Sequence, residues 1–115
     1  MNKTSDKSVN SIKISENVIS KITEAAISSI DGVRGLTEPK TGLSALFSKP
    51  SEQPVNIRMN GGSAEILLNI IVSDSCKVKS AAEKIQKRVK EDVQNMTGIA
   101  VTKVSVFVRD IVFEN

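Results

Sequence analysis

The feature that most constrains this chain is a β-hairpin pattern near its centre. Residues 55–60 alternate between apolar and polar side chains, and residues 63–72 carry an apolar residue at every even position. Between them lies Asn60-Gly61-Gly62, whose residues tolerate the positive φ angles of a tight turn. Leu67 and Ile71 interrupt the polar side of the second strand. We therefore expect a central strand that is partly covered on its second face.

An amphipathic helix is predicted before the hairpin. Ser15 suits the N-cap position, and Glu16 places a carboxylate where the helix dipole favours it. Asp31-Gly32 predicts the end of this helix, and residues 33–36 then form a short apolar segment that is able to pair in a sheet. The apolar stripe comprises Val18, Ile19, Ile22, Ala25, Ala26, Ser29 and Ile30, with Lys21, Thr23, Glu24 and Ser28 on the opposite side.

A second helix and a last strand are predicted after the hairpin. Ser73-Asp74-Ser75 offers N-caps, and Gly98 suits the position after the last helical residue. The helix, residues 77–97, has the apolar stripe Val78, Ala81, Ala82, Ile85, Val89, Val93 and Met96. The final strand runs from about residue 99 to 113, with Val104, Val106 and Val108 on one face and Val101, Lys103, Ser105, Phe107 and Arg109 on the other.

The order of these elements predicts the fold class. Residues 1–8 are predicted to be a disordered polar tail and residues 9–14 a short strand, so that one domain spans residues 9–115. Two helices with one apolar stripe each match an α/β (α+β) two-layer sandwich. In this fold a mixed β-sheet of about four strands has both helices on one face. The other face of the sheet is then free.

Residues 37–54 are predicted to be a long loop. The segment contains Pro39, Gly42, Pro50 and Pro54, and its only apolar island is Leu43, Ala45, Leu46 and Phe47. Loops of this length are uncommon unless they are functional or disordered. We interpret the island as a helical turn docked on the core or as disordered, with an exposed hook for a partner as the alternative.

The composition disfavours several classes of function. The chain has no histidine, tryptophan or tyrosine and a single cysteine, Cys76, which we interpret as a small apolar filler. No catalytic, cofactor-binding or metal-binding residues are therefore predicted. The apolar runs are too short for a membrane span, and residues 1–8 contain no signal-peptide core, so the cytoplasm is the expected compartment.

Three surfaces are candidates for interaction. They are the apolar island Leu43, Leu46 and Phe47, the second sheet face with Leu67, Ile71, Val101 and Phe107, and the basic face of the second helix centred on Lys84, Lys87 and Arg88. The first two suit self-association or a protein partner. The third suits nucleic acid or an anionic membrane surface, or is simply a solvated face with the i,i+4 pairs Lys87–Glu91 and Arg88–Asp92. We favour the solvated face.

Gly32-Val33-Arg34-Gly35 has the GxxG spacing of an RNA-binding module. That module needs the motif between two helices, and Pro39 makes a poor start for a second helix here. We interpret the motif as a helix end followed by a tight turn.

Three stretches together resemble the alkaline shock protein family of Gram-positive bacteria, the Asp/Gls-type envelope stress proteins. They are residues 12–19, residues 30–33, and residues 89–99 with the valines that follow at 101, 104 and 106. The resemblance implies a small cytoplasmic protein without known catalytic residues, linked to envelope homeostasis and sometimes held at the inner face of the membrane by an integral membrane partner. Some relatives are associated with fatty-acid synthesis genes instead.

The resemblance and the residues together predict a non-enzymatic interaction or scaffold protein of the envelope stress response. We expect it to form a homo-oligomer and to bind a membrane-anchored partner. The alternatives are a regulatory protein for a metabolic enzyme of fatty-acid synthesis and a nucleic-acid-binding module that uses residues 77–97, although nucleic acid is not the expected partner.

Overall fold

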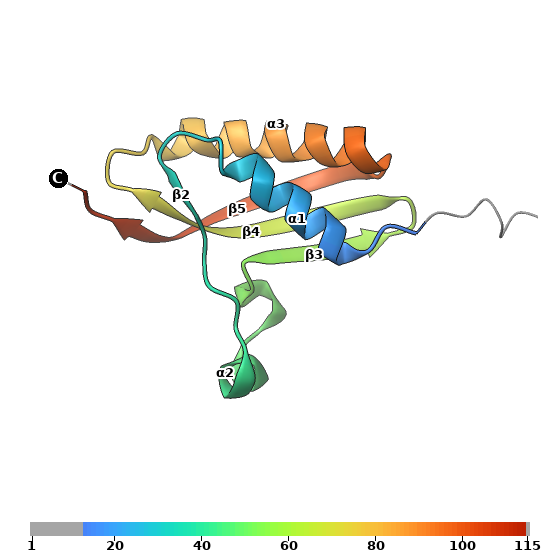
Figure 1. Ribbon diagram of the computed structural model, residues 1–115, viewed down its shortest axis with the longest axis horizontal. Coiled ribbons are helices and arrows are strands. Elements are labelled where there is room, and N and C mark those ends of the chain that lie inside the picture. The colour runs from blue at the N-terminus through green and yellow to red at the C-terminus, as the bar shows by residue number, and fades with distance from the viewer. Residues whose placement is uncertain (1–12, 115) are drawn as a thin grey trace, which may run out of the picture.

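The computed structural model describes residues 13–114, so the predicted tail and most of the predicted strand 9–14 lie outside the described residues. Figure 1 shows a layer of two long helices, a sheet beneath it, and a segment that projects away from both. The elements are α1 (Glu16–Ile27), β2 (Val33–Leu36), α2 (Gly42–Phe47), the 3-10 helix η2 (Pro50–Glu52), β3 (Val55–Asn60), β4 (Ser63–Ser73), α3 (Val78–Thr97) and β5 (Ala100–Val112).

Strand β4 organises the sheet, because every other described strand pairs with it. β3 pairs antiparallel with residues 63–68 of β4, across the predicted turn at Gly61, whose φ is +65°. β2 pairs antiparallel with residues 70–72. β5 runs parallel to β4 along its whole length. The sheet is therefore mixed, as predicted, and β2 and β3 follow one another along the same edge of β4.

Helices α1 and α3 pack against each other and cover the same face of the sheet, which confirms the predicted two-layer arrangement. The core between the layers contains Ile19, Ile22, Ala26 and Ile27 of α1, Ile66, Leu68, Ile70 and Val72 of β4, and Ala81, Ile85, Val89 and Val93 of α3. Burial of this apolar surface is the main force that holds the layers together.

The prediction for α1 was wrong about where the helix ends and about the sides on which Thr23 and Val18 lie. The helix ends at Ile27, and Gly32 lies in the following turn with a φ of +86°. Thr23, expected on the solvent side, is fully buried, and its hydroxyl has no hydrogen-bond partner among the described residues. Val18, expected on the apolar side, is 42% exposed. Because α1 packs against both the sheet and α3, the junction of these layers sets which side of the helix is buried.

The start of α3 also differs from the prediction. The helix begins at Val78, and its N-cap is Lys77 rather than a residue of Ser73-Asp74-Ser75. Ser73 belongs to β4, where its backbone N–H donates to the carbonyl of Gly32 at 2.8 Å. The predicted end is confirmed, because Gly98 has a φ of +77° and caps the helix.

Val101 was assigned to the wrong face of the sheet. It pairs with Ala64, whereas the next partners are Glu65 and Lys103, so the strand bulges at Thr102. One extra residue in a strand reverses the alternation of its side chains. Val101 is consequently only 2% exposed and belongs to the core.

Candidate interaction surfaces

A buried polar side chain occupies the junction between β2 and β3. Asn69 of β4 is 1% exposed, and its backbone accepts from the N–H of Thr37 and donates to the carbonyl of Pro54. Its side-chain Nδ2 donates to the carbonyls of Ser51 and Gln53, at 2.8 and 2.6 Å. Asn69 therefore holds both ends of the segment 37–54, which we call the arm.

The two legs of the arm are also joined to each other. The side chain of Gln53 accepts from the backbone N–H of Lys40 at 3.0 Å and donates to the carbonyl of Lys40 at 3.3 Å. Asn56 Nδ2 donates to the carbonyl of Pro50, which ties the second leg to β3. These bonds organise a segment that has almost no apolar contact with the core.

The tip of the arm is the short helix α2, which has no buried residue. Leu43, Leu46 and Phe47 are 75%, 74% and 85% exposed. Figure 1 shows α2 well away from the two layers of the fold. The expectation that this island docks on the core was therefore wrong, and the exposed alternative fits the structure. Docking fails because the arm leaves the sheet at its edge and points away from the helices.

The sheet face opposite α1 and α3, which we call the free face, is not covered by a helix in the part of the chain that the structure describes. Leu67 and Ile71 are half-buried there, and Phe107 is 43% exposed. A shallow groove of about 200 Å³ on this face is lined by Asn56, Arg58, Glu65, Ile66, Leu67, Lys103 and Ser105. The free face thus combines apolar side chains with charges of both signs.

Arg109 links the arm to the free face. Its Nε donates to Asn69 Oδ1 at 2.6 Å, and its guanidinium lies 5.0 Å from the centre of the Phe107 ring. A cation over an aromatic face is an attractive contact. A second hollow, of about 360 Å³, lies at the base of the arm and is lined by Thr37, Glu38, Lys40, Glu52, Asn69 and Arg109. Of this network, the sequence predicted the place of Phe107 on the free face; the only local sign of the rest is that Asn69 is a polar residue inside an apolar run.

The basic face of α3 is separate from these two surfaces. Lys84, Lys87 and Arg88 are exposed on the helix layer, which lies on the opposite side of the sheet from the free face. Arg88 forms the predicted ion pair with Asp92 at 3.1 Å. Within residues 13–114, the other predicted pair, Lys87–Glu91, does not come within ion-pair distance.

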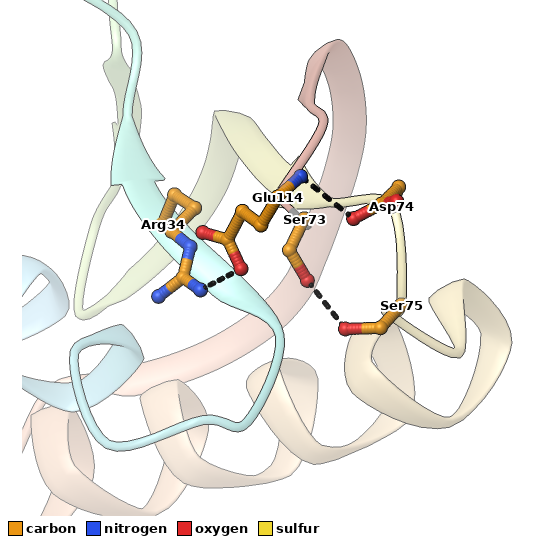
Figure 2. Close-up of polar contacts among 5 residues, drawn as sticks. All are labelled: Arg34, Ser73, Asp74, Ser75 and Glu114. Atoms are coloured by element: carbon orange, nitrogen blue, oxygen red, sulfur yellow. Dashed lines mark hydrogen bonds and ion pairs between the residues drawn. The ribbon is translucent and has the colours of Figure 1, made fainter.

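A polar cluster that the sequence did not reveal lies at the end of the sheet where β4 and β5 finish (Figure 2). Arg34 of β2 pairs with Glu114, whose backbone N–H donates to Asp74 Oδ1 at 3.2 Å, while the Ser73 and Ser75 hydroxyls lie 3.1 Å apart. The hydrogen bond and the charge of Glu114 raise the pKa of Arg34 further above its ordinary value. The cluster joins the last residues to β2 and to the turn before α3, which is a structural role.

Among the described residues, no three His, Cys, Asp or Glu side chains form a group able to hold a metal ion. No helix within them has the length and apolar character to span a membrane. Cys76 is half-buried and packs against the core, in agreement with its interpretation as a filler.

Comparison with known proteins adds a family and a fold. The model of the alkaline shock protein 23 family, described as having a cell envelope-related function, matches residues 4–113. The uncharacterized protein YloU of Bacillus subtilis (strain 168) is 30% identical over 104 residues, which cover 87% of each chain. A copper form and a manganese form of the MamM CTD are similar in structure, each with a TM-score of 0.52 and 17% identity. The matches cover 84% of this chain, 98% of the copper-form chain and 99% of the manganese-form chain. At this level of identity they show that the fold is shared.

Proposed function

Because this chain belongs to the alkaline shock protein 23 family, whose function is related to the cell envelope, we propose that it is a non-enzymatic interaction protein of the envelope stress response. In this proposal, copies of the protein associate with one another and with a membrane-anchored partner, at the cytoplasmic face of a Gram-positive membrane. The contacts are made by the free face and the arm.

The observation that carries the proposal is the exposed Phe107 on a sheet face that no described helix covers. Large aromatic residues, held in place by neighbours and surrounded by polar groups, are frequent centres of protein interfaces. Phe107 is held in this way, because Arg109 lies over its ring and is itself fixed by Asn69. The surrounding charges, among them Arg58, Glu65 and Lys103, would form a polar rim.

The proposal is tested by placing a charge at the centre of the free face. We expect Phe107→Glu to lower the mass of the assembly, measured by size-exclusion chromatography with light scattering. The change removes the apolar ring from the centre of the face, and a carboxylate loses its water on assembly even with Arg109 beside it. Phe113→Glu is the matched control, since Phe113 is 78% exposed beyond the end of β5. A wild-type protein that is monomeric at tens of micromolar, or an assembly that Phe107→Glu leaves intact, contradicts self-association through this face.

The partner is tested by cross-linking in native cells, followed by capture from separate membrane and soluble fractions. We expect an integral membrane protein whose recovery is unaffected by nuclease. Recovery of a soluble enzyme of fatty-acid synthesis would support the regulatory alternative instead.

A second candidate function is nucleic-acid binding, which the exposed Lys84, Lys87 and Arg88 favour. Such binding weakens steeply with salt because counterions are released from the phosphates. A binding signal that is flat between about 50 and 200 mM salt would exclude this function. Captured partners that disappear after nuclease treatment would support it.

A further inference from the structure

The tip of the arm presents apolar side chains that the protein itself does not cover. Leu43, Leu46 and Phe47 are spaced i, i+3 and i+4 in α2, so they share one side of the helix. All three are at least 74% exposed. Large apolar groups gathered in this way at the outermost point of a fold are costly in water unless they have a binding partner.

The serine hydroxyls of α2 and of its C-cap are satisfied within the helix. Ser44 Oγ donates to the carbonyl of Thr41 at 2.7 Å, and Ser48 Oγ donates to the carbonyl of Ser44 at 2.6 Å. A polar group that already has a hydrogen-bond partner loses less on leaving water than a free one. The tip can therefore leave water with little penalty from its serine side chains.

A lysine flanks the tip on either side in the sequence, and the acidic Glu38 and Glu52 lie nearer the base of the arm, in the hollow that Lys40 also lines. Lys40 precedes the N-cap residue Thr41, and Lys49 follows the C-cap residue Ser48. Both lysines are exposed, and neither forms an ion pair within residues 13–114. Long lysine side chains place their ammonium groups at a charged surface while their stems lie along apolar groups.

We propose that the tip of the arm inserts into the head-group region of an anionic lipid bilayer, with Leu43, Leu46 and Phe47 in the apolar layer and Lys40 and Lys49 at the lipid phosphates. This inference goes beyond the proposed function, in which a protein partner holds the chain at the membrane: the free face keeps its protein contacts, and the tip of the arm contacts lipid instead of protein. Here the contact with lipid is direct.

The chemistry of the tip favours a bilayer over a protein surface. A standard protein interface buries about 800 Å² on each partner, and three apolar side chains supply roughly half of this area. Shallow insertion into a bilayer needs only a small apolar patch with lysines at its border. The hydrogen bonds of Asn69 and Gln53 keep the arm extended, so the tip reaches a flat surface before the rest of the fold does.

A single tip is a weak membrane anchor, comparable to other small apolar insertions. Several copies in one assembly would bind together with a much higher effective affinity. The measured affinity is therefore expected to rise with self-association, and the experiment must record both.

The test is flotation of the purified protein with protein-free vesicles. We expect the wild-type protein to float with vesicles that contain phosphatidylglycerol and to float less with pure phosphatidylcholine vesicles. Phe47→Ser should weaken binding at least about tenfold, because it removes a large apolar side chain. Lys49→Glu should weaken it by about fivefold or more, since one basic residue contributes about this factor at an anionic surface.

Phe113→Ser is the matched control, since it removes a phenylalanine outside the arm that is 78% exposed, against 85% for Phe47. It should leave flotation unchanged, and light scattering on each variant separates loss of lipid binding from loss of assembly. A wild-type protein that stays with the soluble fraction overturns the inference and leaves the tip to a protein partner. Equal flotation of the wild type and Phe47→Ser overturns it as well. Neither result bears on self-association through the free face.

Discussion

Replacement of Asn69 tests how the arm is attached to the fold. The side chain makes three hydrogen bonds, to the carbonyls of Ser51 and Gln53 and to the guanidinium of Arg109. Each neutral bond contributes about 1 kcal/mol to stability and the bond to the charged group somewhat more. Because Ser51 and Arg109 are exposed and can regain water, we expect Asn69→Ala to lower the free energy of unfolding by about 3 kcal/mol.

The loss should be measured by thermal and urea unfolding, together with hydrogen exchange of the arm. A decrease of about 3 kcal/mol corresponds to a fall in Tm of roughly 15 °C for a domain of this size. The amides of residues 37–54 should exchange faster, while those of the β3–β4 hairpin keep most of their protection, because the arm unfolds locally once it is released.

Asn69→Asp tests the two bonds to the arm more specifically, because it keeps the shape of the side chain and its bond to Arg109. It replaces the Nδ2 donor by an oxygen that repels the carbonyls of Ser51 and Gln53. Asn95→Ala on the exposed side of α3 is the control, and its effect should be close to zero. An Asn69→Ala variant within about 1 kcal/mol of the wild type, or unchanged exchange in the arm, refutes the assigned role of Asn69.

Four further substitutions have expected effects on the free energy of unfolding, each measured by urea denaturation. Thr23→Val should stabilise the protein by about 1 kcal/mol, because the buried Thr23 hydroxyl has no partner among the described residues; a loss of stability would contradict this. Gly32→Ala should cost more than about 2 kcal/mol, because its φ is +86° and the new Cβ would lie 2.8 Å from the Cβ of Cys76. Gly61→Ala, the comparison for Gly32, has a φ of +65° and open space and should cost only about 1 kcal/mol, so equal costs would refute the steric argument. Arg34→Ala should leave stability nearly unchanged, because its ion pair is exposed, and a clear loss would show that the pair does more than join Glu114 to β2.

The parts of the fold that were predicted correctly depend on short-range chemistry. Asn60-Gly61-Gly62 forms the turn because these residues accept the required backbone angles, and the alternation of residues 55–60 and 63–72 sets the two faces of the hairpin. Ser15 caps α1 through its contact with the N–H of Val18, and Gly98 ends α3. The two apolar stripes then required two helices on one face of a sheet.

The candidate interaction surfaces were only partly predictable. Leu43, Leu46 and Phe47 stood out as an apolar island, but the sequence pattern favoured a docked or disordered segment. Their exposure follows from the position of the arm at the sheet edge, between two strands that pair with the same side of β4. Phe107 was assigned correctly to the free face. The contact of Arg109 with both Phe107 and Asn69 had no local signal, because 40 residues separate Asn69 from Arg109.

The sequence by itself determined the hairpin, the caps and the pairing of two helices with one sheet, since these depend on backbone preferences and on the period of apolar residues. Tertiary structure decided the burial of Thr23, the inward side of Val101 and the clamping of the arm by Asn69. Each of these results depends on partners distant in the chain. A helix buries whatever faces its neighbours, a single bulge inverts a strand, and a lone polar residue in an apolar run takes its role from the groups that surround it.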